Sequence, residues 1–113
     1  MEVKRGEVYL ASFPNPHTKE GEDLRPVLII QNDCVSQSLS TVTVLPITKG
    51  IIPSFSTFIQ IYLQPLGECK VLINNMTTIP KERLIRKLDV VCEKDMERIT
   101  YAVLKDLANM PAR

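Results

Sequence analysis

Short apolar stretches separated by turn residues occupy most of the chain, and their pattern is that of β-strands. In TVTVLPI, residues 41–47, threonines alternate with valines, which indicates a strand with one buried face. The run VLII within residues 26–31 indicates a strand buried on both faces. Similar stretches predict strands over residues 7–13, 56–63, 69–73 and 85–91. A series of short strands of this kind predicts a small barrel or sandwich.

The pattern changes at Glu93, where helical spacing replaces alternation. Apolar side chains then recur every three or four positions, at Met96, Ile99, Val103, Leu107 and Met110. This spacing predicts an amphipathic helix that packs its apolar stripe across one opening or face of the barrel. PKERL, residues 80–84, predicts a single helical turn, because proline is favoured at a helix start.

The stretch LRPVLIIQND, residues 24–33, joins a charged residue to the buried strand. A proline pushes the residue before it into an extended conformation, so Pro26 is expected to aim Arg25. Pro26 donates no amide hydrogen bond, which suits the first residue of a strand. We therefore expect Arg25 at the mouth of a strand. From this segment alone, a surface arginine that happens to precede a strand is the slightly better interpretation.

Length and charge limit what the chain can be. The 113 residues are expected to form one domain, residues 1–113. The net charge is only +1, so any binding of nucleic acid must rely on a local patch of cations. The longest apolar runs span about four residues, far short of the roughly 18 that a membrane span needs.

The three cysteines, Cys34, Cys69 and Cys92, are odd in number and far apart. They are expected to be small buried apolar residues rather than disulfide partners or metal ligands. MEVKRGEV at the N-terminus has no apolar signal region, and a reduced, cytoplasmic location is expected.

The chain contains few residues with obvious catalytic chemistry. His17 is the single histidine, so one chain cannot supply a histidine pair, and it is most simply a solvated loop residue. Cysteine and histidine spacing does not suit zinc. Glu22 and Asp23 are interpreted as the solvated face of a polar loop over residues 14–24. The groups that remain are arginines, hydroxyls, amides and a loop carboxylate. Such a set suits a site that acts on an anionic phosphate.

Four segments of the chain occur in a characteristic order: KRGEVYLASF, LRPVLIIQND, VLPIT and TTIPKERL. Together with the amphipathic C-terminal pattern that follows them, they resemble the MazF/PemK toxins of bacterial type II toxin–antitoxin systems. The resemblance implies a mainly β, SH3-like small barrel with a C-terminal helix, and a homodimer. It implies a metal-independent, cofactor-free, sequence-specific endoribonuclease that cuts single-stranded RNA. In that family the ribose 2′-hydroxyl attacks the adjacent phosphate and leaves 2′,3′-cyclic phosphate and 5′-hydroxyl ends. An antitoxin with an acidic, disordered tail covers the RNA site.

The resemblance also implies roles for particular residues. Arg25 matches the catalytic arginine, Thr48 the catalytic threonine and Glu20 an acidic position in the first loop. The group that removes the 2′ proton is not readable from the sequence. The residues expected to bind RNA are Lys19, Lys49, Lys70, Asn75 and Thr77.

The sequence also departs from the family pattern. Lys19 replaces a serine or histidine in KEGEDL, and Cys69 replaces a common serine. Asn75, Met76 and Thr77 stand where the family has Gln-Ile-Arg. These departures lie where bases are thought to be read, so they leave the recognition sequence open.

Three other interpretations compete with a nuclease. The same barrel serves gyrase poisons of the CcdB type, which bind rather than cut, but these end in a tryptophan-bearing tail and this chain has no tryptophan. A peptide-binding SH3-like module needs an aromatic groove. Phe13, Phe58 and Tyr62 lie on predicted strands, which speaks against such a groove. A family member that has lost activity stays open, and without the family match Thr48 would be interpreted as a strand-capping hydroxyl.

Overall fold

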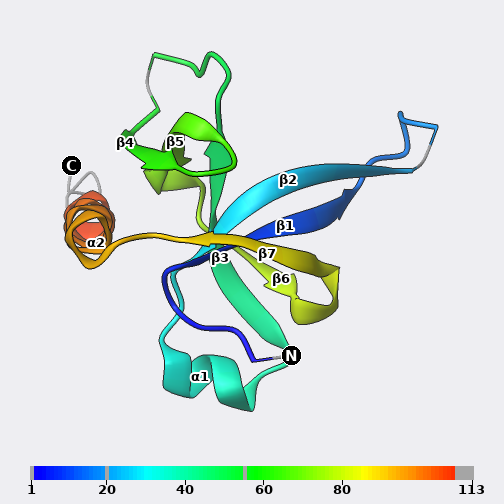
Figure 1. Cartoon of the computed structure of the whole chain (residues 1–113), viewed down its shortest axis with the longest axis horizontal. Helices are drawn as coiled ribbons and strands as arrows, with labels where there is room; N and C mark the ends of the chain where they lie inside the picture. The colour runs from blue at the N-terminus through cyan, green and yellow to red at the C-terminus, as the bar shows by residue number, and fades with distance from the viewer. Residues whose placement is uncertain (1, 20, 55, 109–113) are drawn as a thin grey trace.

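The computed structural model describes residues 2–19, 21–54 and 56–108. Strands dominate these residues, with a short helix in the first half of the chain and a longer one near its end (Figure 1). The elements are β1 (Glu7–Pro14), β2 (Glu22–Ile29), α1 (Asp33–Ser38), β3 (Thr41–Thr48), β4 (Phe58–Leu63), β5 (Gly67–Leu72), the 3₁₀ turn η1 (Ile73–Asn75), β6 (Thr77–Pro80), the 3₁₀ turn η2 (Lys81–Arg83), β7 (Leu84–Val90) and α2 (Glu93–Ala108). No helix among the described residues is long and apolar enough to cross a membrane.

The strands form one curled antiparallel sheet around β3. Its order is β4-β5-β3-β2-β1-β7, and β6 pairs with β3 as well. One edge of β3 pairs with β6 through residues 41–44 and with β5 through residues 47–48. The β1–β2 hairpin and the β4–β5 hairpin leave β3 in different directions (Figure 1). The predicted mainly β architecture with a C-terminal helix is therefore confirmed.

β2 crosses the middle of the molecule and supplies both faces of the core. Leu28 and Ile30 belong to one apolar cluster, and Val27 and Ile29 belong to the other. All four are buried, as the continuous apolar run predicted. Alternate side chains of a strand point to opposite faces, so β2 is packed on both sides. A shift of its register by one residue would move each buried side chain to the opposite face.

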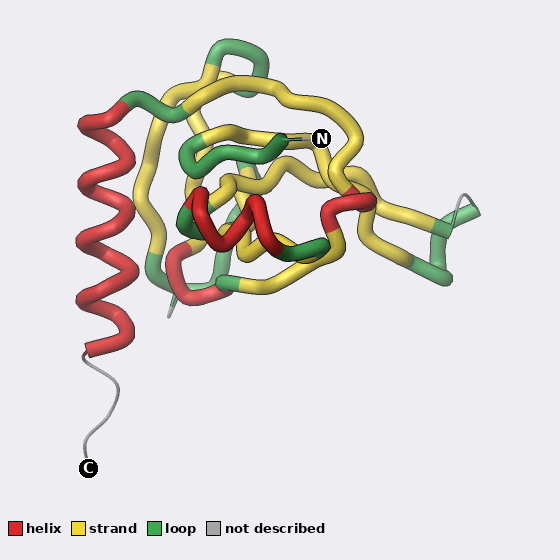
Figure 2. Tube along the Cα trace, turned by 90° about the horizontal axis from the view of Figure 1, so that it is seen from below, coloured by secondary structure: helices red, strands yellow, loops and turns green. Residues whose placement is uncertain are grey.

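Helix α2 lies along one side of the sheet (Figure 2) and is held there by few residues. Ile99 and Val103 are buried against the first cluster. The guanidinium of Arg5 donates to the Ile30 carbonyl and to the Thr100 hydroxyl, which ties the helix to the end of β2. The predicted apolar stripe is thus only partly buried. Leu107 is exposed, and Met110 lies outside the described residues.

Three features differ from the sequence-based prediction. Helix α1 was not predicted, because DCVSQS has no apolar period; Asn32 begins it by accepting a hydrogen bond from the Cys34 amide (2.8 Å). Strand β6 was also missed, because only Ile79 of its four residues is buried and long-range pairing with β3 creates it. Finally, β2 begins at Glu22 rather than at Pro26, because residues 22–25 pair with β1.

Candidate active site

Two prolines mark the point where β2 and β3 separate. The two strands pair from Ile29, opposite Val44, as far as Val27, opposite Pro46. A proline has no amide hydrogen, so Pro26 and Pro46 cannot donate to further pairing. Beyond them, β2 continues with β1 alone, while β3 turns to pair with β5. The strands therefore diverge as a fork, which is visible in Figure 1.

A cavity of about 480 Å³ lies in this fork. Arg25 and Thr48 lie two positions beyond the last paired residues of β2 and β3, and both side chains line the cavity together with Lys49. Its apolar walls are Pro26, Pro46, Ile47, Ile52, Leu66 and Leu72. A few polar groups set in an apolar recess are typical of a ligand site. The structure thus brings together three of the predicted site residues, from two strands and the turn after β3.

Arg25 is positioned by its own strand. Its Nη2 lies 3.2 Å from Asp23 Oδ2, and the same oxygen accepts a hydrogen bond from Asn15 Nδ2 (2.9 Å). The interpretation of Asp23 as a solvated loop residue was wrong, because it lies on β2 two positions before Arg25 and shares its face. The Arg25 side chain is 64% exposed. The contact with Asp23 engages only part of the guanidinium group, and its remaining N–H groups can bind an anion.

The strand-mouth prediction for Arg25 was wrong in detail. Arg25 is the fourth residue of β2 and lies opposite Ala11 of β1. Pro26 is likewise inside the strand, where β2 has a neighbour on one side only. A proline is tolerated there because the missing amide faces no partner strand. The proline therefore ends the pairing with β3 rather than beginning β2.

Thr48 is the last residue of β3, and its hydroxyl is oriented by the turn that follows. Thr48 Oγ1 accepts a hydrogen bond from the Gly50 amide (3.1 Å). A threonine hydroxyl has one proton and two lone pairs, so this contact leaves the proton for donation to a ligand. Lys70 of β5 lies opposite Thr48, and its Nζ donates to the Gly50 carbonyl (3.2 Å). Lys70 therefore adds positive charge beside the cavity without lining it.

The other predicted residues are not gathered in the fork. Lys19 is exposed in the turn between β1 and β2, with His17. Asn75 and Thr77 are exposed on η1 and β6. Thr77 pairs with Val44, four positions before Thr48, which at strand spacing is roughly 13 Å away along β3. Glu20 lies outside the described residues.

The cysteines only partly match the prediction of small buried residues. Cys69 is buried, but Cys34 and Cys92 are exposed, and all three are free thiols. Burial raises the pKa of the Cys69 thiol, and the nearby Lys49 charge opposes that effect. Cys69 is therefore a neutral packing residue on the inner face of β5, the strand that also carries Lys70. Within the described ranges, no three histidine, cysteine or acidic side chains are grouped closely enough to hold a metal ion.

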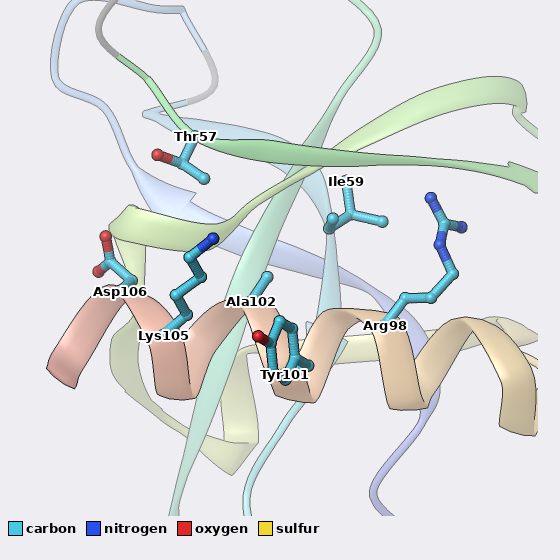
Figure 3. Close-up of a pocket in the computed structure, with 7 residues that line it drawn as sticks. All are labelled: Thr57, Ile59, Arg98, Tyr101, Ala102, Lys105 and Asp106. Carbon is cyan, nitrogen blue, oxygen red and sulfur yellow. The ribbon is translucent and has the colours of Figure 1, made fainter. Parts of the chain in front are cut away.

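A second cavity, of about 510 Å³, lies between α2 and the start of β4 (Figure 3). Arg98, Tyr101 and Lys105 line it from the helix, and Ile59 of β4 lines the opposite side together with Thr57, which precedes that strand. None of the residues predicted for the active site lies in it. Its Arg98 is already paired with Asp95 (2.9 Å). We therefore place the candidate active site in the fork.

Sequence reasoning missed two parts of the fork. Asp23 was missed because its strand pairing is not visible in a local stretch of polar residues. The apolar walls, such as Ile52, Leu66 and Leu72, were missed because apolar side chains at an active site look like any other core residues. No local signal in the sequence distinguishes them.

Comparison with known proteins agrees with the resemblance seen in the sequence. The family model for the PemK-like, MazF-like toxin of type II toxin–antitoxin systems matches residues 4–106. Endoribonuclease MazF of Staphylococcus saprophyticus is 31% identical over 105 residues, covering 89% of this chain and 88% of the relative. Endoribonuclease EndoA of Bacillus subtilis is 32% identical over 112 residues, covering 96% and 97%.

The fold is similar to that of a solved mycobacterial endoribonuclease in complex with its cognate antitoxin. The TM-score is 0.70 with 21% identity, covering 98% of this chain and 99% of that one. This likeness confirms the predicted fold class, a small barrel-like β-sheet with a C-terminal helix.

Proposed function

The chain belongs to the PemK-like, MazF-like toxin family of type II toxin–antitoxin systems, and on that premise we propose that it is a metal-independent, sequence-specific endoribonuclease of single-stranded RNA. One observation carries the proposal. Arg25 and Thr48, which match the family's catalytic residues, come from separate strands and line the same cavity. Relatives that are 31% and 32% identical are named endoribonucleases, which supports the same activity.

The proposed reaction is an internal transfer of the phosphate. The ribose 2′-oxygen forms a bond to phosphorus, the bond from phosphorus to the 5′-oxygen breaks, and a 2′,3′-cyclic phosphate remains. The 2′-hydroxyl loses one proton and the leaving 5′-oxygen gains one, so no net proton is consumed. Negative charge grows on the non-bridging oxygens in the transition state, and preorganised donors lower its energy.

Arg25 and Thr48 supply those donors. The Arg25 guanidinium, held by Asp23, offers two parallel N–H groups to the phosphate. It can also protonate the leaving 5′-oxygen. The Thr48 hydroxyl donates its proton to a non-bridging oxygen. The proton is free for this because the contact with the Gly50 amide uses only a lone pair of the hydroxyl oxygen. Glu20 is the residue that the family pattern suggests for removal of the 2′ proton.

Substrate and partners follow from the same assignment. Lys49 and Lys70 would hold phosphates beside the cut, with Lys19, Asn75 and Thr77 along the rest of the strand. The protein would act in the cytoplasm as a homodimer. Its inhibitor would be an antitoxin with an acidic tail; the mycobacterial structure of similar fold holds its own cognate antitoxin.

The decisive experiment is incubation of the purified protein with a long RNA in EDTA, followed by mapping of the cut ends. We expect cleavage at a limited set of sequences, with 2′,3′-cyclic phosphate and 5′-hydroxyl ends. Kinase labelling without prior phosphatase treatment marks 5′-hydroxyl ends but not 5′-phosphates. A 2′,3′-cyclic phosphate resists phosphatase when the fragments have not been treated with acid. Cleavage that requires Mg²⁺ and leaves 5′-phosphates would contradict the mechanism. Absence of cleavage at any sequence would indicate a non-catalytic toxin-fold protein.

A further inference from the structure

The outer face of β4 carries two exposed aromatic side chains beside the fork. Phe58, Gln60 and Tyr62 point outward, whereas Ile61 and Leu63, which alternate with them, are buried. Phe58 is 38% exposed and Tyr62 is 66% exposed. Single exposed apolar side chains are common on folded proteins, so the neighbours of these rings, rather than their exposure, decide what they can bind.

A continuous series of contacts connects Phe58 to the proposed catalytic hydroxyl. The Gly50 amide donates to Thr48 Oγ1 (3.1 Å), and Lys70 Nζ donates to the Gly50 carbonyl (3.2 Å). The same Nζ lies 5.7 Å from the centre of the Phe58 ring. Phe58 also lies opposite Leu72, which lines the fork cavity. A ligand that leaves the cavity past Lys70 therefore reaches Phe58 next.

We propose that Phe58 is a substrate-positioning residue on which one nucleobase of the bound RNA stacks, next to a phosphate held by Lys70. The inference rests on the proposed function. Single strands bind proteins by combining cations that follow the backbone with aromatic rings that receive bases. Lys70 and Phe58 offer that combination within a few ångströms, and Lys49 and Arg25 continue the positive charge into the cavity.

Tyr62 differs from Phe58 in one respect and provides the matched control. Both rings lie on the outer face of β4, but Tyr62 is opposite Glu68 of β5, whereas Phe58 is opposite Leu72 and has the Lys70 Nζ 5.7 Å from its ring centre. A carboxylate beside a ring repels the phosphates of an approaching strand. Tyr62 is therefore expected to contribute little to RNA binding, although it is the more exposed of the two.

The test compares Phe58→Leu, Phe58→Trp and Tyr62→Leu. Leucine keeps apolar volume but removes the aromatic face. Binding is measured by fluorescence anisotropy with a labelled 2′-O-methyl oligonucleotide that spans a mapped cut site and lacks the attacking hydroxyl. Phe58→Leu should weaken binding by roughly 5- to 150-fold, which is typical for the loss of one stacked base. It should raise KM for the unmodified RNA while kcat changes less. Phe58→Trp should restore binding, and Tyr62→Leu should stay within about twofold of the parent protein.

A second measurement identifies the stacked base. Abasic nucleotides are placed one at a time along the same strand, and each is tested with the parent protein and with Phe58→Leu. One abasic position should weaken binding to the parent protein but not to Phe58→Leu, which is the non-additivity expected for direct partners. If Phe58→Leu and every abasic strand combine additively, or if Tyr62→Leu weakens binding equally, Phe58 is not a stacking residue. Cleavage by the parent protein is scored separately, so the inference can fail while the proposed function stands. A parent protein that neither cleaves nor binds would refute both.

Discussion

At the scale of single residues, the proposed mechanism depends most on Arg25, whose side chain is exposed and outside the core. Arg25→Ala should lower kcat/KM for RNA cleavage by about 10²–10³-fold, as is typical when one transition-state donor is lost. Thermal unfolding should change little, because exposed side chains away from buried networks contribute little to stability. Arg86→Ala is the matched control, since Arg86 is an exposed strand arginine on β7, outside the fork. Full activity of a folded Arg25→Ala protein would remove Arg25 from the mechanism.

Thr48 is tested with a pair of variants that separate its hydroxyl from its packing. Thr48→Ala should also reduce kcat, by less than the loss of Arg25, because a neutral donor stabilises developing charge less than a charged one. Thr48→Ser keeps the hydroxyl and its contact with the Gly50 amide, so it should retain most of the activity. If Thr48→Ala and Thr48→Ser behave alike, Thr48 is a strand-capping residue and not a donor to the phosphate.

The residues of the site were only partly predictable. Arg25 and Thr48 were found through their match to a family motif, because nothing in the local pattern of either segment favours catalysis over a surface role. Asp23 was misinterpreted, since its function depends on a strand pairing that the polar sequence does not reveal. The spacing of Phe58 and Tyr62 on β4 was visible in the sequence, but the direction of their face was not. That direction depends on which neighbours the strand pairs with.

At the scale of elements, β5 carries a buried thiol on one face and a cation on the other. Cys69 points inward and is 2% exposed, whereas Lys70 points to the fork side. Burial raises the pKa of the Cys69 thiol above its ordinary value of 9.0, so near pH 8 it stays protonated, and only the thiolate reacts. A disulfide reagent at pH 8 should therefore modify Cys34 and Cys92 quickly and Cys69 only after unfolding.

The assignment of the slow thiol is checked with single variants. Cys69→Ala should abolish the slow phase, whereas Cys92→Ala should remove one fast equivalent and leave the slow phase intact. At a pH equal to the ordinary pKa of a thiol, Cys69 should still react more slowly than the exposed thiols, because its own pKa is shifted upward. Three equally fast thiols in the native protein would contradict the packing of β5.

The elements themselves were well predicted where a local pattern determines them. Strands β1, β3 and β4 and helix α2 were expected within one or two residues, because each has a clear period of its own. Strand β6 and the first half of β2 were not, because they form by pairing with distant segments. Long-range pairing also creates the fork, so the place where the predicted residues meet could not be read from any single stretch of sequence.

At the scale of the whole molecule, a net charge of +1 means that RNA affinity must come from a few local cations. Each phosphate contact to a single strand adds about −0.7 to the slope of log affinity against log salt concentration. Arg25 and Lys49 line the cavity and Lys70 lies beside it, so two to four contacts are expected, which corresponds to a slope of roughly −1.5 to −3.

Lys49→Ala should flatten this slope by somewhat less than one unit and weaken RNAs of different sequence about equally, because a phosphate contact carries no sequence information. Lys94→Ala on α2 removes the same charge outside the fork, so it separates a local contact from the effect of net charge. Binding titrations at several salt concentrations, with non-cleavable strands of two sequences, measure both variants. If Lys49→Ala and Lys94→Ala change the slope equally, the molecule binds RNA through its overall charge rather than through the fork. A loss confined to one sequence would mean that Lys49 contacts a base.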